Sequence, residues 1–237
     1  GDAAGLAGSC ISGGGGQYSG AQASACIECV AGRYVESTGS DAASDCIQCG
    51  AGRYADAAGS DEASDCVGCA VGKYVEATGS SAASDCIECA AGKYVTTSGS
   101  TAASACIDCG AGQYGEVTGG SDAEQACIRC AAGMYTTSAG RTYCDGCQAG
   151  SITDTGAEAG ATTCTACGAG NYSAASDVAS CSECAAGSVT NTGSADGATT
   201  CAAGAAGRYA ASSVGAWSGG QAGTYAGVAG STLCRQC

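Results

Sequence analysis

The chain has no histidine, no proline and no phenylalanine in 237 residues, and only one tryptophan and one methionine. Without histidine it cannot form a Ser–His or Cys–His catalytic pair, which excludes the commonest nucleophilic enzymes. The apolar content of 45% is carried mostly by alanine and cysteine, so little large apolar surface is available for a core. We therefore expect no enzyme activity and no cofactor, and we expect covalent cross-links to replace much of the core.

Positive charge and long apolar runs are also scarce. Eight Lys and Arg residues face 22 Asp and Glu residues, which gives a net charge of −14. Nucleic acids and anionic membrane surfaces select Lys/Arg patches, so neither is an expected partner. No apolar run approaches the roughly 18 residues of a membrane span, so we expect no direct membrane insertion of this segment. The sequence starts without Met or a signal peptide, so a secreted protein would be represented here by a mature or partial chain.

The chain is instead rich in cysteine, with 22 residues of this type. Most of them form C-x-x-C pairs that recur about every 20 residues. A short fixed period predicts an array of small units, and this cysteine content is typical of disulfide scaffolds in oxidising compartments. We therefore expect small disulfide-rich repeats in an elongated solenoid-like rod, with sparse short β-hairpins and single helical turns. The expected location is extracellular, either secreted or at the cell surface.

The spacing of the pairs divides the chain into four parts. Residues 1–25 form a degenerate first module, and 26–126 form a uniform block of five repeats of 20 or 21 residues. Residues 127–200 alternate between repeats of 17 and 20 residues, and 201–237 form a Gly/Ala-rich terminal module that contains Trp217. In this last part Cys201 is the first cysteine of an incomplete C-x-x-C pair, and Gly204 occupies the position of the second cysteine.

Within one repeat we expect a short strand over 33–36, because Tyr and Val suit a pleated edge. The T-G-S that follows is typical of a turn, and Ser40 is the predicted N-cap of a helical turn over 41–44. A tyrosine follows seven of the second cysteines by five residues. These rings either pack on a neighbouring disulfide and on the glycine two residues earlier, which we favour, or form an aromatic ladder for carbohydrate. The tyrosines are Tyr34, Tyr54, Tyr74, Tyr94, Tyr114, Tyr135 and Tyr172.

The cysteine pairs also have the spacing of four-cysteine zinc sites. Each such site carries a charge of −2, and the chain is already acidic, so disulfides are favoured over metal. Connectivity is not fixed by the sequence. Crossed pairing, Cys26–Cys46 with Cys29–Cys49, leaves Cys10 without a role. Sequential pairing uses Cys10 and closes loops worth about 3 kcal/mol each. Its bridges are Cys10–Cys26, Cys29–Cys46, Cys49–Cys66, Cys69–Cys86, Cys89–Cys106, Cys109–Cys127, Cys130–Cys144, Cys147–Cys164, Cys167–Cys181 and Cys184–Cys201.

Two cysteines remain outside the sequential scheme. Cys234 would pair with residue 204 if that residue were cysteine, and Cys237 has no further pair to join. We interpret Cys234 and Cys237 as intersubunit or unpaired cysteines.

The repeat C-x-x-C-x-A-G-x-Y, followed by G-S and the next cysteine, resembles the ephrin-receptor-like cysteine-rich repeat, whose usual form is C-x-x-C-P-x-G-x-Y. The resemblance covers about residues 10–201, and it extends more loosely to tumour-necrosis-factor-receptor modules, EGF-like modules and protist surface proteins. It implies extracellular, disulfide-stapled rods and no particular ligand. The chain departs from it at the proline position, which holds Val30, Gly50, Ala70, Ala90, Gly110, Ala131, Gln148, Gly168 and Ala185.

Two weaker signals concern the surface. Acidic residues beside the cysteines are Asp41, Asp45, Asp61, Glu62, Asp65 and Asp85. They lack the alternating acidic ligands of a strong calcium-binding loop. We therefore favour the interpretation that they are solvated acidic residues of turns, and calcium binding is the weaker alternative. Asn171 begins the sequon N-Y-S and is a candidate acceptor of a covalent glycan.

These observations favour an extracellular structural repeat protein that assembles head to tail with copies of itself into a filament, appendage or surface coat. The alternative is a ligand-binding or adhesion stalk in the ectodomain of a cell-surface receptor.

Overall fold

The computed structural model describes residues 15–20, 25–206, 208–210, 212–216, 218–219, 224–225, 229–230, 232–233 and 235–236. The chain divides into two compact units. Unit 1 holds the described residues of Gly1–Asp108 and Glu116–Ala126, and unit 2 holds those of Cys109–Gly115 and Cys127–Cys237. Cys10, Trp217, Cys234 and Cys237 lie outside the described residues.

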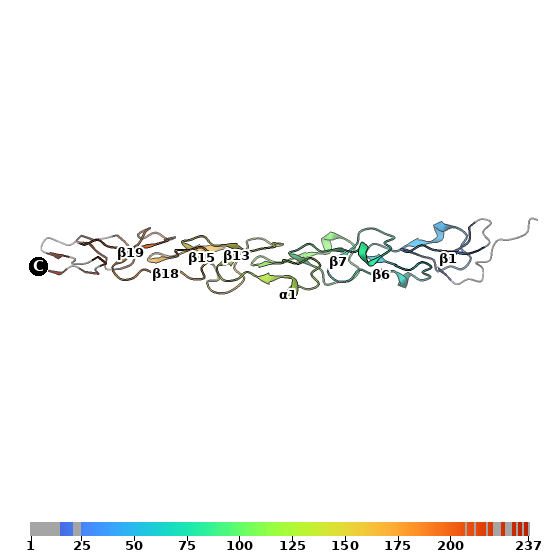
Figure 1. Cartoon of the computed structure of the whole chain (residues 1–237), viewed down its shortest axis with the longest axis horizontal. Coiled ribbons are helices and arrows are strands. Elements are labelled where there is room, and N and C mark those ends of the chain that lie inside the picture. The colour runs from blue at the N-terminus through green and yellow to red at the C-terminus, as the bar shows by residue number, and fades with distance from the viewer. Residues whose placement is uncertain are drawn as a thin grey trace, which may run out of the picture. The chain divides into compact units, whose positions relative to one another are not determined.

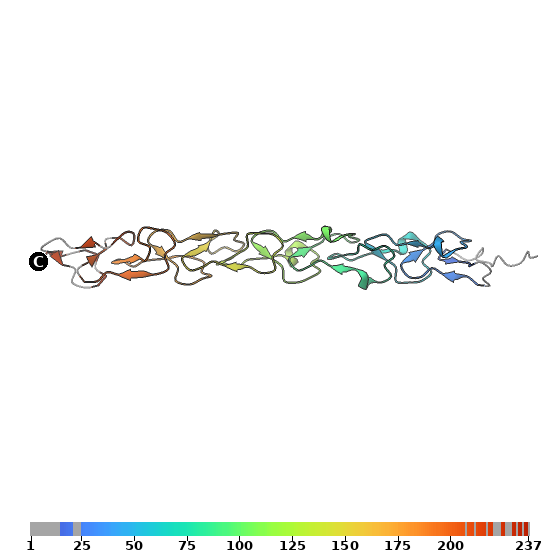
Figure 2. The ribbon, with the colours of Figure 1, turned by 90° about the horizontal axis from the view of Figure 1, so that it is seen from above.

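Unit 1 is a series of two-stranded antiparallel hairpins, which follow one another along the unit in blue to green (Figures 1 and 2). Each first strand carries the Tyr of a G-x-Y sequence, and each second strand lies between the two cysteines of a C-x-x-C pair. The hairpins are β1 (Gln17–Tyr18) with β2 (Ile27–Glu28), β3 (Arg33–Tyr34) with β4 (Ile47–Gln48), β5 (Arg53–Tyr54) with β6 (Val67–Gly68), β7 (Lys73–Tyr74) with β8 (Ile87–Glu88), and β9 (Lys93–Tyr94) with β10 (Ile107–Asp108).

Unit 2 repeats the hairpin seven times in its described residues. Its 20-residue repeats have strands of three residues, because their second strands begin at the cysteine itself. The hairpins are β11 (Gln113–Tyr114) with β12 (Ile128–Arg129), β13 (Met134–Tyr135) with β14 (Asp145–Gly146), β15 (Ser151–Thr153) with β16 (Cys164–Ala166), β17 (Asn171–Tyr172) with β18 (Ser182–Glu183), β19 (Ser188–Thr190) with β20 (Cys201–Ala203), β21 (Arg208–Tyr209) with β22 (Ser218–Gly219), and β23 (Thr224–Tyr225) with β24 (Arg235–Gln236).

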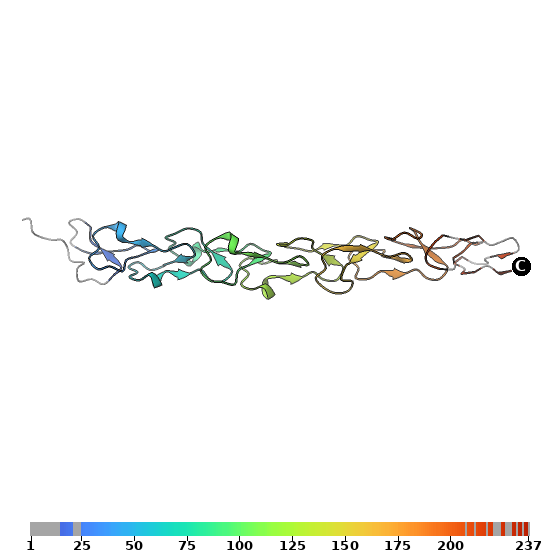
Figure 3. The ribbon, with the colours of Figure 1, turned by 180° about the vertical axis from the view of Figure 1, so that it is seen from behind.

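Short helical turns precede the first cysteine of several pairs in unit 1. They are the 3-10 turns η2 (Ala43–Asp45), η3 (Ala63–Asp65), η4 (Ala83–Asp85) and η5 (Ala103–Ala105), and the α-helical turn α1 (Ala123–Ala126). Figures 1 and 3 show η2 in blue and η3 in teal on opposite sides of unit 1, so successive modules point in different directions.

The expected helical turn exists, but its predicted limits and cap were wrong. The turn begins at Ala43, two residues later than predicted, and Ser40 is not its cap. The Asp45 carboxylate accepts hydrogen bonds from the backbone N–H groups of Asp41 and Ala42, at 3.1 and 3.2 Å. Ser40 is instead buried, and its carbonyl oxygen accepts a hydrogen bond from the backbone N–H of Ser19.

The predicted strand over 33–36 is shorter than expected and ends at Tyr34. Beyond this residue the chain turns to the next module, and the backbone N–H of Val35 donates to the carbonyl oxygen of Ser60 at 3.1 Å. The fold class is confirmed: tandem small disulfide-rich modules contain two-stranded hairpins and little helix.

The core of unit 1 is a set of small clusters, each built on one disulfide. In one of them Cys49, Ala55 and Cys66 are buried together, and Tyr34 of the preceding hairpin packs against them. Tyr18, Tyr54 and Tyr74 pack in the same way on the clusters that follow them. The predicted packing of a tyrosine on a neighbouring disulfide is therefore confirmed for Tyr34, Tyr54 and Tyr74, each of which is partly buried against a disulfide of the next module.

The Gly/Ala-rich terminal part contains two hairpins, β21–β22 and β23–β24, and therefore two modules. Gly204 takes the backbone place of a second cysteine: its N–H donates to Gly187 at 3.3 Å, and its carbonyl oxygen accepts from Gly230 at 2.9 Å. Trp217 and Gly220 precede and follow β22 in the sequence, where other repeats have cysteines. Cys234 precedes β24, so its partner position in the sequential scheme is residue 220 and not residue 204.

Candidate functional site: the repeated disulfide junctions

The junctions between modules are built around disulfides that follow the sequential scheme. Nine bridges join described cysteines, and each joins the second cysteine of one pair to the first cysteine of the next. They are Cys29–Cys46, Cys49–Cys66, Cys69–Cys86, Cys89–Cys106, Cys109–Cys127, Cys130–Cys144, Cys147–Cys164, Cys167–Cys181 and Cys184–Cys201.

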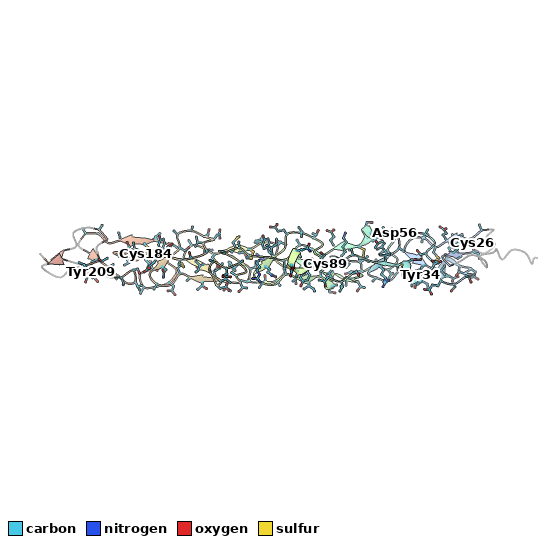
Figure 4. All side chains as sticks on the ribbon, turned by 90° about the horizontal axis from the view of Figure 1, so that it is seen from below. Cys26, Tyr34, Asp56, Cys89, Cys184 and Tyr209 are labelled. Atoms are coloured by element: carbon cyan, nitrogen blue, oxygen red, sulfur yellow. A yellow bond between two sulfur atoms is a disulfide. The ribbon has the colours of Figure 1, made fainter. Side chains whose placement is uncertain are left out.

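These bridges decide between the alternatives that the sequence left open. Crossed pairing does not occur at these cysteines, and bridged sulfurs cannot serve as the thiolate ligands of a zinc site. Cys26 is also disulfide-bonded, whereas Cys10, its partner in the sequential scheme, lies outside the described residues. Cys89 and Cys184, labelled in Figure 4, each begin one bridge, the first in unit 1 and the second in unit 2.

A set of backbone hydrogen bonds surrounds each junction and repeats from module to module. The N–H of Cys49 donates to the carbonyl oxygen of Gly32 at 2.9 Å, and the carbonyl oxygen of Cys49 accepts from Gly79 at 2.8 Å. The N–H of Gly52 donates to the carbonyl oxygen of Val75 at 2.8 Å. Because donor and acceptor belong to different modules, these bonds clamp each module to the next.

Gly52 shows why glycine is needed at this junction. Its φ is +81°, a left-handed conformation that costs little for glycine only. A Cβ at this position would lie 2.8 Å from the carbonyl carbon of Gly99 and closer still to its oxygen. The backbones of two modules therefore meet at Gly52 with no room for a side chain.

Side chains reinforce the junctions in unit 1. Glu36 accepts a hydrogen bond from the backbone N–H of Ala63, 27 residues away, at 3.4 Å. Glu88 accepts from the Thr118 hydroxyl and lies 3.3 Å from the ammonium of Lys73. The hydrogen bond from Thr118, followed by the hydrogen bond and the charge of Lys73, holds the pKa of Glu88 below its ordinary value.

The 20-residue repeats of unit 2 use threonine hydroxyls in their loops. Thr153 is almost fully buried, and its hydroxyl donates to the carbonyl oxygen of Gly156 at 2.7 Å. Asp154 accepts from both the backbone N–H and the hydroxyl of Thr162. Desolvation acts to raise the pKa of Asp154, but the hydrogen bonds from Thr162 and Thr163 together lower it.

Three of the six acidic residues considered as calcium ligands hold helical turns in place. Asp45, Asp65 and Asp85 accept backbone hydrogen bonds at the starts of η2, η3 and η4. Within the described residues, no group of three or more acidic or cysteine side chains is placed to hold a metal ion. Among the same residues, no helix has the length and apolarity of a membrane span.

Asn171, the sequon residue, lies half-buried in β17 opposite Glu183. The hydroxyl of Ser173, the third residue of the sequon, is buried and donates to the carbonyl oxygen of Ala175 at 2.8 Å. A glycan would therefore have to join Asn171 before this strand closes against β18.

One set of junction residues was missed by reasoning from the sequence. The serines Ser40, Ser60, Ser80 and Ser100 are all buried, and their carbonyl oxygens accept the backbone bonds that link modules. The repeated G-S dipeptide carried this signal, but we interpreted it only as a turn and a cap.

Comparison with known proteins bears on this repeated architecture. Residues 16–66 match the family model described as tyrosine-protein kinase ephrin type A/B receptor-like. This chain contains an ephrin-receptor-like cysteine-rich module. The matched segment includes β1 to β5 and the Cys29–Cys46 and Cys49–Cys66 bridges, and the same bridged architecture continues in tandem after it. No curated protein compared with the chain matches it. The many disulfides and the ephrin-receptor-like module indicate an extracellular domain.

Proposed function

We propose that this chain is an extracellular structural repeat protein that forms a filament, appendage or surface coat from copies of itself. The repeated junction is the main support for this proposal. Each module presents the same backbone donors and acceptors to the next, as Gly52 does to Val75 and Gly72 to Val95. A junction of this kind joins like modules within one chain, and the same geometry between chains would propagate head to tail.

The covalent construction suits a load-bearing role outside the cell. The disulfides of the uniform block close loops of nearly constant length, with sequence separations of 17 or 18 residues. In the chain-entropy account each loop contributes about 3 kcal/mol to the stability of its own module. Such modules remain folded without a large common core, as an exposed structural protein requires. The protein is secreted or attached to a cell surface in this proposal, and a glycan on Asn171 would be a further covalent component.

A receptor stalk is the second candidate, and the match of residues 16–66 to a receptor-like family model favours it. In that case the same modules would hold a binding domain at a distance from a membrane, and self-assembly would not be required.

Electron microscopy and sedimentation under non-reducing conditions separate the two candidates. We expect filaments whose length increases with protein concentration, and we expect their loss after reduction and alkylation of the disulfides. Single-chain particles at every concentration, together with a membrane span encoded in the full gene, would support the stalk and contradict the filament.

A further inference from the structure

Unit 2 contains a hollow of about 580 Å³ between the β19–β20 hairpin and the module that follows it. Its lining comes from the loop after β19, from Arg208 in β21, and from Gly215 and Ala216. Tyr209, the residue after Arg208, is labelled in Figure 4 and marks this place in the unit. The volume lies within the range of about 300–1,000 Å³ that is usual for small-ligand sites.

The cation of this hollow has no partner in the described part of the chain. Arg208 is the residue before the strand tyrosine, and four other hairpins also carry Lys or Arg there. All four of those cations are bonded within unit 1: Arg33 to Cys46, Arg53 to Cys66, Lys73 to Glu88 and Lys93 to Asp108.

Arg208 differs from them because Gly219, which has no side chain, lies opposite it in the hairpin. Its guanidinium forms no hydrogen bond or ion pair with any residue that the structure describes. It therefore presents its planar set of N–H donors to the hollow, an arrangement that suits a carboxylate.

The lining of the hollow also lacks negative charge. In unit 1 the hollow beside Tyr74 is lined by Glu76 and Asp85. None of the residues that line the Arg208 hollow is acidic, and Asp196, later in the same loop, is not part of the lining. In a chain of net charge −14, this hollow presents a positive charge with no acid in its wall.

The preceding 20-residue repeat shows that the fold does not require this charge pattern. By spacing from the cysteines, Asp154 corresponds to Asn191 and Asn171 corresponds to Arg208. Asp154 accepts a backbone hydrogen bond from Thr162 at 3.1 Å, and Asn191 accepts the equivalent bond from Thr199 at the same distance. The amide thus keeps the loop in place without the negative charge, and the cation is added beside it.

The loop is held by its own hydrogen bonds and still has polar capacity for a ligand. The Thr192 hydroxyl donates to the carbonyl oxygen of Ala195 at 2.6 Å, which leaves its lone pairs available. The Asn191 amide group donates one hydrogen to Thr199 and keeps the other, and Ser194 is exposed. These groups can exchange hydrogen bonds with the hydroxyls of a ligand.

An apolar part completes the lining. Val189 and Ala202, which are paired across the β19–β20 hairpin, both belong to it. The hollow therefore combines one free guanidinium, several hydroxyl and amide groups, and a small apolar surface.

We propose that this hollow binds a carboxylated sugar, namely a uronic acid unit of an extracellular polysaccharide. The carboxylate pairs with Arg208 through two parallel hydrogen bonds. The ring hydroxyls meet Asn191, Thr192 and Ser194, and the C–H face of the ring covers Val189 and Ala202. A simple anion would use Arg208 only, and a neutral sugar would leave Arg208 unpaired, so a uronic acid is the ligand that uses the whole lining.

The test titrates the full chain, with its disulfides intact, with trigalacturonate, with neutral galactotriose and with acetate, and follows the amide signals by NMR. Arg208→Gln removes the charge but keeps hydrogen-bonding groups. Arg129→Gln is the matched control, because Arg129 is also exposed in unit 2 and has no hydrogen bond or ion pair with described residues. Asn191→Asp introduces the carboxylate of the preceding repeat.

We expect trigalacturonate to shift the amides of residues 191–194 and to bind at least about tenfold more tightly than galactotriose or acetate. Arg208→Gln should weaken trigalacturonate by about tenfold or more, because a charge-assisted pair is lost. Asn191→Asp should also weaken it, and Arg129→Gln should not. The amide spectra and non-reducing peptide maps verify that the variants fold.

Four outcomes would overturn the proposal. They are no binding of trigalacturonate, shifts confined to other parts of the chain, equally tight binding of galactotriose or acetate, and equal weakening by Arg208→Gln and Arg129→Gln. The last of these would mean general charge attraction. The proposal does not rest on the filament function, because a filament and a receptor stalk could both carry this hollow, and its failure would leave both candidates standing.

Discussion

The close backbone approach at Gly52 allows the strength of a module junction to be measured with one methyl group. Gly52→Ala adds a Cβ to a residue whose φ is +81°, at a position where the Gly99 carbonyl group leaves no space. The left-handed conformation costs alanine about 1 kcal/mol more than glycine. Relief of the overlap must move the segment that donates to Val75 and accepts from Cys69, both at 2.8 Å. Loss of these two hydrogen bonds adds about 1 kcal/mol each, so we expect a total near 3 kcal/mol.

Gly39 provides the matched control for this substitution. Its φ is +78°, but a Cβ there would meet no atom of the described residues within 4 Å. Gly39→Ala should therefore cost only the conformational term, about 1 kcal/mol. Gly50, which has open space and is not among the glycines with positive φ, should accept alanine almost without change.

Guanidinium unfolding monitored by near-ultraviolet circular dichroism would give the three free energies. Amide hydrogen exchange would show where protection is lost. Gly52→Ala should deprotect the N–H groups of Gly52 and Cys69, whereas Gly39→Ala should leave them protected. Equal free-energy losses in Gly52→Ala and Gly39→Ala would refute the reasoning, because the junction would then contribute nothing beyond local backbone preference.

Three further predictions concern single interactions. The double change of Cys69 and Cys86 to Ser should lower the unfolding free energy by about 3 kcal/mol; non-reducing peptide maps should still recover Cys49–Cys66 and Cys89–Cys106, and reshuffled bridges would contradict independent junctions. Thr153→Val removes a buried hydroxyl bonded to Gly156 and should cost about 1–3 kcal/mol in thermal unfolding. Thr155→Val removes a hydroxyl whose hydrogen bond to Glu158 is exposed and should cost well under about 1 kcal/mol; similar losses would count against burial as the cause. The pKa of Glu88 is lowered in the fold, so the contribution of this carboxylate to stability is present above its ordinary pKa and is lost as pH falls through its pKa in the folded protein. Thr118→Val should raise the pKa of Glu88 in a carboxyl-carbon NMR titration. An unchanged titration would show that Thr118 is not the main cause of the lowered pKa.

The period and the hairpins could be predicted from the sequence because both are local. The C-x-x-C spacing marks where each hairpin closes, and Tyr34 with Ile47 has the residue types of a short paired strand. The sequential bridges also follow from the spacing if Cys10 must have a disulfide partner, because crossed pairing leaves it without one. These features depend on residues less than about 20 positions apart.

The contacts between modules could not be predicted in the same way. The bond from Gly52 to Val75 joins residues 23 positions apart, and the approach of Gly52 to Gly99 spans 47 positions. Gly52 lies in A-G-R-Y and Gly39 in T-G-S, but neither motif shows which of the two a neighbouring module approaches; among the described residues, only a Cβ at Gly52 would overlap the backbone of another module. The hydrogen bonds that cap η2 also depend on packing. Both Ser40 and Asp45 could accept hydrogen bonds from the backbone N–H groups at the start of this turn. Ser40 is buried, and Asp45 accepts these bonds.

The order of the bridges has a mechanical consequence. A pull on the two ends of the array would pass from Cys46 to Cys49 along three peptide links and cross the disulfide to Cys66, so the loop between Cys49 and Cys66 would carry none of the load. The bridged modules would therefore behave as a nearly inextensible tether. Residues 202–233 contain no cysteine, so there the tension must run through the backbone itself. Under tension this stretch would extend before the disulfide-bridged modules do.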